Sequence, residues 1–344
     1  MPKKHRVFYL LLLLSAAGLF LLDIFIGSVH IPFQEVVRVL VGGQSQKETW
    51  DIIILQSRLP QSLAAVLCGA ALSVSGLKMQ TLFKNPLAGP YILGISSGGA
   101  LGVALFIMGA GALGFSMGDL SLNSSLGIAL SSILGSVSIL SLLIVVIRRL
   151  NDIMTVLILG VMIGSVITAL IGLIQFFSYE ADLKTFVMWT MGDLSAVTGN
   201  QLLILFPVVV FGLIASFMLS KPLNSYLLGE TYATSIGVNI NRSRMLIIII
   251  TSILTGSVTA FCGPIGFIGI VIPHMARFLA KTYDHRILIP LSILLGMNVL
   301  LLADILSQLP QLNFNLPINS ITSLIGIPVI IWIIFKNKRM ASIN

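Results

Sequence analysis

Apolar runs of bilayer length recur along the whole chain, and most of them end beside Lys or Arg residues. The hydrocarbon core of a bilayer is about 30 Å thick, so a helix needs about 20 apolar residues to cross it. Only 9% of the residues are charged, whereas soluble domains carry roughly 25%. The chain is therefore predicted to be an all-α, polytopic membrane protein, one transmembrane domain over residues 1–344 with about ten transmembrane helices.

The first span is predicted at residues 7–29. This run is longer than the apolar part of a cleaved signal peptide, which covers about 7–15 residues. The polar segment 31–57 is expected to be an outside loop, and residues 186–191 could form a short re-entrant or surface helix. The other spans are expected at residues 58–82, 91–110, 122–147, 153–177, 202–219, 245–262, from 263 to the basic residues near 277, 287–306 and 318–335.

A cluster of helix-breaking residues follows the seventh span. Proline and glycine interrupt helices, and an interruption at membrane depth persists only where protein or a cavity covers the backbone. A tight outside turn between the seventh and eighth spans is an alternative with at least equal support. The residues concerned are Gly263, Pro264, Gly266, Gly269 and Pro273.

The distribution of positive charge predicts the orientation of the chain in the membrane. The net charge of +8 could suggest nucleic-acid binding, but Lys and Arg cluster at the ends of apolar runs, as the positive-inside rule describes. Only Arg38, Lys47, Arg58 and Lys184 fall in segments assigned to the outside. Both termini are therefore expected in the cytoplasm, and no nucleic-acid partner is expected.

A polar segment at residues 221–244 lies between two apolar runs and is longer than a simple connector. Pro222 suits the first turn of a helix, and Gly229 is placed to end that helix. Glu230 would then begin a second short helix, where a negative charge meets the positive end of the helix dipole. The segment is either a docking element for a partner or an amphipathic loop on the lipid surface. Close approach of another surface would be allowed by the small residues Ala233, Ser235 and Gly237.

Several kinds of chemistry are missing from the sequence. No phosphate-binding loop is present, so nucleotide hydrolysis by this chain is not expected. The histidines are scattered, and His274 is expected to be satisfied locally rather than to bind a metal. Cys68 and Cys262 are predicted to be small buried side chains, neither a disulfide nor a metal pair. A membrane enzyme, a metal site and a resident cofactor are therefore not predicted.

Carboxylates are rare within the spans. An ion-coupled transporter usually needs them there, whereas Asp23 and Asp304 lie toward the outer ends of their predicted helices. Coupling to a proton or sodium gradient is therefore the second hypothesis. A conduit that receives its energy from a partner is the first.

Several long motifs, in order, resemble the FecCD family, the permease subunits of ATP-driven importers for iron-siderophores, haem and vitamin B12. The resemblance covers nearly the whole chain. It rests on R-L-P at 58–60, G-A-A-L-S-V-S-G at 69–76, M-Q-T-L-F-K-N-P-L-A-G-P at 79–90, L-G-I-S-S-G at 93–98, M-W-T-M-G-D at 188–193, L-G-E at 228–230, S-I-G-V-N at 235–239, G-P-I-G-F-I-G-I-V-I-P-H at 263–274 and D-H-R at 284–286.

The resemblance implies a vitamin B12-importer-permease-like fold in a bacterial-type inner membrane. It implies that a second copy of the chain completes a homodimer, with the substrate path along the dimer axis. It also implies two cytoplasmic ATPase subunits that carry ATP-Mg, an extracytoplasmic binding protein, and a metal-chelate or tetrapyrrole substrate. Residues 1–344 would then be one permease domain with a cytoplasmic coupling element at 221–244.

The resemblance also implies three sets of functional residues. In the family, arginines beside the R-L-P motif and near the outer end of the ninth span meet acidic residues of the binding protein; here Arg58 keeps its charge, but the other two positions are Gln61 and Gln308. The ATPase-coupling residues are Leu228, Gly229, Glu230, Ala233, Ser235, Gly237 and Val238. The translocation path and its cytoplasmic gate comprise Asn85, Leu87, Ser96, Ser97, Asn151 and Asp152.

Overall fold

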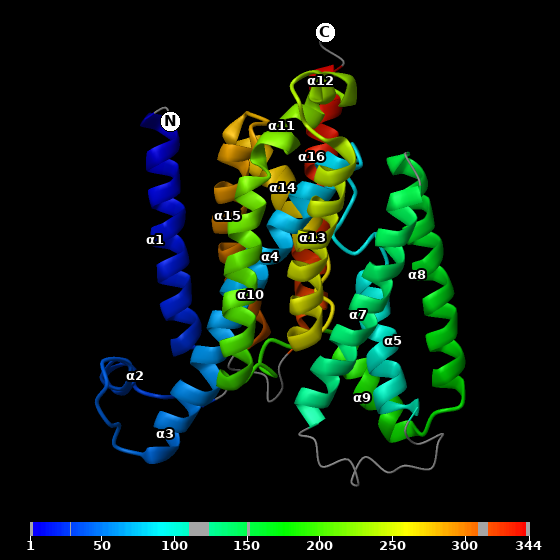
Figure 1. Ribbon diagram of the computed structural model, residues 1–344. Coiled ribbons are helices and arrows are strands. Elements are labelled where there is room, and N and C mark those ends of the chain that lie inside the picture. The colour runs from blue at the N-terminus through cyan, green and yellow to red at the C-terminus, as the bar shows by residue number, and fades with distance from the viewer. Residues whose placement is uncertain (1–2, 28, 110–123, 150–151, 309–315, 342–344) are drawn as a thin grey trace.

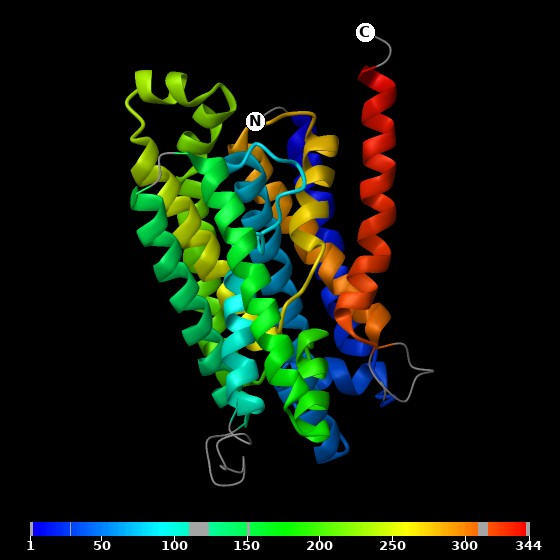
Figure 2. The same ribbon diagram turned by 90° about the vertical axis from the view of Figure 1, so that its right-hand side faces the viewer.

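The computed structural model describes residues 3–27, 29–109, 124–149, 152–308 and 316–341 (Figures 1 and 2). Every regular element in these ranges is a helix. They are α1 (Lys3–Phe25), α2 (Phe33–Leu40), α3 (Glu48–Ile52), the π-helix η1 (Ile53–Arg58), α4 (Leu59–Leu82), α5 (Ile95–Ile107), α7 (Ser124–Arg149), α8 (Ile153–Phe176), α9 (Glu180–Thr190), α10 (Gly199–Met218), α11 (Ser220–Leu227), α12 (Glu230–Ser235), α13 (Ile240–Cys262), α14 (Ile268–Ala280), α15 (His285–Ser307) and α16 (Ile318–Ala341).

The long helices confirm the predicted fold class. Within the described ranges, 7 helices are long and apolar enough to cross a membrane. Shorter apolar helices at Ile95–Ile107, Ile268–Ala280 and Ile318–Ile331 occupy the third, eighth and tenth expected spans. The protein is an all-α, polytopic membrane protein.

Figure 1 shows the start of α1, the end of α16 and the pair α11–α12 at one end of the bundle. Helices α2, α3 and α9 lie at the opposite end. Because the two ends of the chain lie at the same end of the bundle, this arrangement fits a chain that crosses the membrane an even number of times. Which side faces the cytoplasm stays a prediction from the distribution of Lys and Arg.

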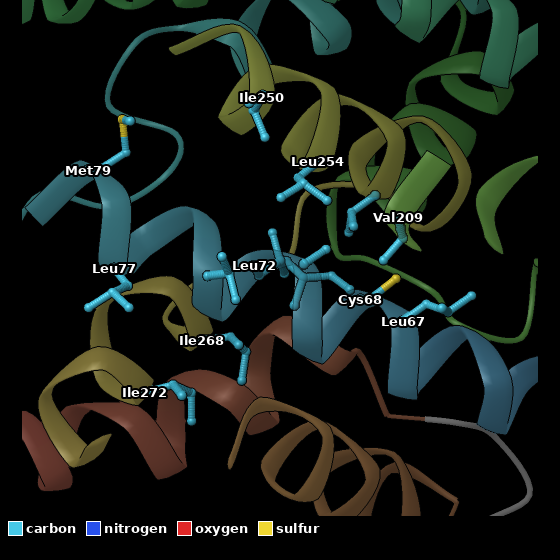
Figure 3. Close-up of a cluster of buried hydrophobic side chains, with 14 of the residues drawn as sticks. Leu67, Cys68, Leu72, Leu77, Met79, Val209, Ile250, Leu254, Ile268 and Ile272 are labelled. Atoms are coloured by element: carbon cyan, nitrogen blue, oxygen red, sulfur yellow. The ribbon is translucent and has the colours of Figure 1, made fainter. Parts of the chain in front are cut away.

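Helix α4 is the centre of the packing. In an apolar stretch of 18 residues within the segment that contains it, 89% of the residues are buried, against 11% in the corresponding stretch of α8. Its apolar side chains contact α10, α13 and α14, and Figure 3 shows Leu72 and Leu77 of α4 among Val209, Leu254 and Ile268. Apolar composition alone does not explain this burial, because α8 is more apolar than the segment that contains α4; α4 is buried because other helices surround it.

Glycines allow α4 to approach its neighbours closely. A Cβ added at Gly69 would overlap the backbone of Gly296 in α15, and one added at Gly76 would overlap Gly269 in α14. Lipid gives no hydrophobic drive for helices to associate, so close backbone contact and van der Waals packing hold them together. These two contacts fix α4 against α14 and α15.

The segment expected as a polar outside loop is largely helical, which corrects the prediction. It contains α2 and α3, and α3 runs through η1 into α4 as one helical segment of 35 residues, Glu48–Leu82. Helix α2 buries Val36 and Val39 against α1. The i, i+3 spacing of these two valines was the signal for a helix.

The helix break after α13 lies within the protein. Helix α14 has 13 residues, about 20 Å at 1.5 Å per residue, which is less than the hydrocarbon thickness. The turn before it is covered, because Asn319 donates to Pro264 O (2.6 Å) and accepts from Gly266 N (2.7 Å). The Tyr91 hydroxyl accepts from Ile265 N at 3.1 Å. These contacts favour the first alternative, a covered break at membrane depth.

The close approach of α4 and α15 gives a direct test. In Gly296→Val, the new side chain would meet Ser73 and the backbone of Gly69, and such overpacking typically costs about 1–3 kcal/mol. We expect a lower thermal unfolding temperature for the purified protein in detergent. Gly172→Val is the matched control, because a Cβ at Gly172 meets nothing within 4 Å. Equal losses in the two variants would contradict the proposed packing.

Candidate functional site

The polar segment at 221–244 folds as the predicted helix–Gly–helix. Gly229, with φ of +104°, separates α11 from α12, and Gly237, with φ of +82°, follows α12. Positive φ favours glycine at both positions. Asn239 then caps α13, because its side chain accepts a hydrogen bond from Arg242 N at 2.9 Å.

One face of this segment is fixed to the rest of the protein. Tyr226 is buried, and its hydroxyl bonds to Ser243 and, at 3.2 Å, to Ile240 O. Burial raises the pKa of the Tyr226 phenol. Glu230 accepts a hydrogen bond from the Arg244 guanidinium at 2.5 Å. The segment is therefore anchored to the first turns of α13 and is a folded unit.

The other face exposes apolar side chains. Leu227 is 44% exposed, Leu228 67%, Tyr232 46% and Ile236 54%. We call these four residues the apolar patch. They lie at the end of the bundle that carries α11 and α12 (Figure 1), which is the end predicted to face the cytoplasm.

The residues predicted to contact the ATPase differ in how far they are exposed on the surface of the protein. Leu228, Ser235 and Gly237 are exposed, and Gly229, Glu230 and Val238 are partly buried. Ala233 is fully buried, so it cannot belong to an exposed docking face. Its small side chain lets α12 pack closely on the segment beneath it. Tyr232 and Ile236 were not selected from the sequence, although their spacing of four residues from each other was a usable signal of a shared helix face.

A hollow of about 400 Å³ lies between α5 and α8. Of the residues predicted for the path, Ser97 lines it, whereas Ser96 is buried. The hydroxyls of Ser165 and Thr168 donate to carbonyls of their own helix, so their oxygens remain acceptors for a ligand. Among the described residues, those lining the hollow are uncharged: Tyr91, Ile92, Gly94, Ser97, Gly160, Val161, Gly164, Ser165 and Thr168.

The predicted cytoplasmic gate is seen in part. Asn85 closes a tight turn by accepting a hydrogen bond from Leu87 N at 2.9 Å, and Leu87 is 54% exposed. Asp152 caps α8, and hydrogen bonds from Thr155 lower the pKa of the Asp152 carboxyl. Asn151 lies outside the described residues. The gate roles of these residues stay predictions.

The Arg58 side chain is buried and does not form an exposed rim charge. It is 5% exposed, and its guanidinium donates to Ile24 O (3.0 Å), Phe25 O (3.1 Å) and Val29 O. Carbonyls at a helix C-terminus lack partners within the helix. Arg58 therefore satisfies the end of α1, and this geometry gives no support to direct docking of a binding protein.

Gln61 and Gln308 are also buried, at 5% and 8% exposed. Gln61 donates to both carboxylate oxygens of Asp304, at 3.0 and 3.1 Å. Gln308 donates to Asp304 at 3.0 Å and to Asp23 at 3.3 Å. The two glutamines therefore join α1, α4 and α15 and lie within the protein rather than on its outer surface.

The hydrogen bonds of Gln61 predict non-additive stability effects. Gln61→Leu would remove the amide nitrogen that donates to both oxygens of the buried Asp304 carboxylate, which should cost about 1–3 kcal/mol. Asp304→Leu in the Gln61→Leu background should cost much less than Asp304→Leu alone, because both partners are then apolar. Thermal unfolding of the single and double variants in detergent measures this coupling, expected at about 0.5–3 kcal/mol. Additive losses would show that the pair does not interact.

Comparisons with known proteins agree with the fold and the motifs. A family model described as the FecCD transport family matches residues 11–336. The chain is 37% identical over 294 residues to the vitamin B12 import system permease protein BtuC of Salmonella typhi, covering 84% of this chain and 85% of that protein. BtuC of Salmonella newport (strain SL254) matches with the same identity and coverage.

Solved structures give the same answer for the fold. One described as an inward-facing conformation of a metal-chelate type ABC transporter matches with a TM-score of 0.83 and 28% identity over 96% of this chain and 99% of that chain. PsaBC from Streptococcus pneumoniae, in complex with Fab, has a TM-score of 0.50 at 16% identity and shows likeness of fold alone. On the family model and on the BtuC identity, the chain belongs to the FecCD transport family.

Proposed function

We propose that this chain is the permease subunit of an ATP-driven importer that moves a metal chelate or tetrapyrrole into the cytoplasm. The observation that carries the proposal is the apolar patch on a folded segment, in a FecCD-family chain without a phosphate-binding loop. Such a chain needs an ATPase partner, and the patch gives that partner a surface to bind. Two copies of the chain, two ATPase subunits and a binding protein would form the complex.

The patch has the composition of a binding surface. Its members Leu227, Leu228, Tyr232 and Ile236 stand on helices whose opposite face is anchored to α13. Aromatic residues are enriched in protein interfaces, and pre-ordered surfaces lose less entropy on binding. A rigid segment can also pass a displacement on to the helices to which it is anchored. Docking of the ATPase on residues 221–244 therefore fits better than a loop lying on lipid.

The hollow between α5 and α8 fits a path for a large ligand. Its walls present hydroxyl oxygens and backbone atoms to a ligand. None of the described residues that line it carries a charged side chain. Such a wall binds weakly, which lets a ligand leave as well as enter. The relatives' names, a vitamin B12 permease and a metal-chelate transporter, support tetrapyrrole and metal-chelate ligands as the substrate class.

Docking of the binding protein is proposed at the end opposite the apolar patch, through α3 and α9. Both helices lie at that end (Figure 1). Glu48 and Asp51 of α3 border a surface hollow of about 450 Å³ there. Arg58, Gln61 and Gln308 would support this end from within, because they hold α1 against α4 and α15. With this end outside, both termini would be cytoplasmic in a bacterial inner membrane.

Ion-coupled secondary transport remains the alternative, but the site favours it less. Asp23 and Asp304 bond to Gln61 and Gln308 in the junction of α1, α4 and α15, not to the hollow between α5 and α8. A carboxylate that couples an ion to a ligand would be expected to reach the ligand path. Neither of these two does so in the described structure.

The apolar patch predicts how ATPase binding is lost. Tyr232→Ser should weaken association with the ATPase subunit by about 2 kcal/mol or more, as expected for an interface aromatic residue, and Leu228→Asp should abolish it. Co-purification and titration of the ATPase onto the permease in nanodiscs measure both effects. Tyr179→Ser is the matched control, because Tyr179 is 69% exposed in the segment leading into α9, at the opposite end. Unchanged binding by both patch variants would contradict docking at residues 221–244.

A further inference from the structure

A chain of hydrogen bonds between side chains joins α11 to α4 through His285. His285 is 1% exposed. Its Nδ1 lies 2.7 Å from Asn224 Oδ1 in α11, and its Nε2 lies 2.8 Å from Thr81 Oγ1 in α4. These contacts link residues 61 and 204 positions apart in the sequence. One buried side chain thus touches the proposed coupling segment and the central helix of the bundle.

The orientation of Asn224 is set by its other partners. Its Nδ2 donates to Asp284 Oδ1 at 2.6 Å, and its Oδ1 accepts from His285 N at 2.8 Å. Asp284 also caps α15 by accepting from Arg286 N at 3.0 Å. Burial alone would raise the pKa of Asp284, but the hydrogen bonds from Arg286 and Asn224 lower it below its usual value. Asn224 therefore holds α11 against the start of α15 with both ends of its amide.

This arrangement also sets the direction of the hydrogen bonds in a neutral ring. Since Asn224 Oδ1 has no hydrogen, the proton between it and the ring must lie on His285 Nδ1. The neutral ring then accepts a hydrogen bond at Nε2 from the Thr81 hydroxyl. The same hydroxyl lies 3.0 Å from Leu77 O, its alternative acceptor within α4. Thr81 can thus switch partners when the ring moves, without leaving its helix.

Thr81 lies at the end of α4 that leads into the predicted gate. Thr81 O accepts a hydrogen bond from Lys84 N at 3.3 Å, and Gln80 O accepts one from Asn85 N at 3.2 Å. His274 of α14 bonds through Nε2 to Pro86 O at 2.8 Å. The turn at 84–87 therefore depends on the last turn of α4 and on α14. A shift of this last turn would move the turn with it.

We propose that Asn224, His285 and Thr81 are positioning residues that transmit a displacement of α11 to the turn at 84–87. The inference deepens the proposed function and rests on residues 221–244 being the coupling segment. Closely packed, hydrogen-bonded elements move between discrete arrangements rather than deform continuously. Loss of the Thr81 hydroxyl would leave α11 attached to α15 but remove the hydrogen bond that links His285 to the last turn of α4.

The test uses a reporter on the gate. Leu87 is 54% exposed, so Leu87→Cys supplies a reactive thiol, while Cys68 and Cys262 are buried and give little background. The permease–ATPase complex in liposomes is labelled with a maleimide, with and without ATP and vanadate. ATP hydrolysed per ligand transported is measured in the same complexes without label. Thr81→Val removes the hydroxyl while keeping the shape of the side chain, and Thr81→Ser retains the hydroxyl.

The expected result separates these variants. ATP should change the labelling rate of the introduced thiol in the parent, which carries Leu87→Cys alone, and in Thr81→Ser. Thr81→Val and His285→Leu should lose this change and should hydrolyse about fivefold more ATP per ligand, the low end of allosteric coupling. Tyr9→Phe is the matched control: it removes another hydrogen bond to the first turn of α15, from Tyr9 to Ile287 O at 2.9 Å, and should behave as the parent.

Three results would overturn the inference, and they differ in what else they overturn. If the parent complex responds to ATP and Thr81→Val and His285→Leu respond equally, the relay is refuted while the proposed function stands. If the ATPase does not bind the parent chain, the proposed function fails and the relay fails with it. A lost response in Tyr9→Phe as well would show that general loosening of α15 is the cause, which also refutes the relay.

Discussion

The fold depends on the close packing of α4. This helix is surrounded by α10, α13, α14 and α15, and glycines let its backbone meet two of them directly. In a bilayer, apolar side chains gain little by leaving lipid for protein, so fit between surfaces must supply the stability. Small residues at these contacts make that fit possible. Larger side chains there would separate α4 from the helices that it organises.

Because α4 is held along its length, its two ends can have different tasks. At one end, Gln61 contributes to the junction with α1 and α15, and Arg58, just before α4, satisfies the end of α1. At the other end, Thr81 meets His285 and the turn at 84–87 begins. A helix that joins the Gln61 junction at one end to the proposed gate at the other suits a protein that alternates between two openings. The apolar patch adds the surface through which a partner could drive that alternation.

Much of this architecture could be predicted from the sequence because its signals are local. Length and hydropathy placed the long helices, and Gly229 and Gly237 marked the helix–Gly–helix, where the structure shows positive φ at both. Cys68 and Cys262 are buried, as predicted. The helices hidden in the segment 31–57 were missed because its charges suggested a loop, although Val36 and Val39 carried a helical spacing.

The burial of Arg58, Gln61 and Gln308 could not be predicted, because it depends on distant contacts. Arg58 meets carbonyls that lie 29 to 34 residues earlier, and Gln61 meets Asp304, 243 residues later. A charged residue at the end of an apolar run looks the same in sequence whether it faces water or caps a neighbouring helix. Likewise, Ala233 was expected at an exposed docking surface because its small side chain would allow a partner to approach closely. In the structure Ala233 is buried, so it packs against the interior of the protein instead.

The most direct test of the central claim is ligand uptake into liposomes that contain the permease and its ATPase, with the binding protein and its ligand outside. We predict uptake that requires ATP inside the liposomes and does not change when proton and sodium gradients are collapsed. Uptake by the permease alone, driven by an ion gradient without ATP, would contradict the account.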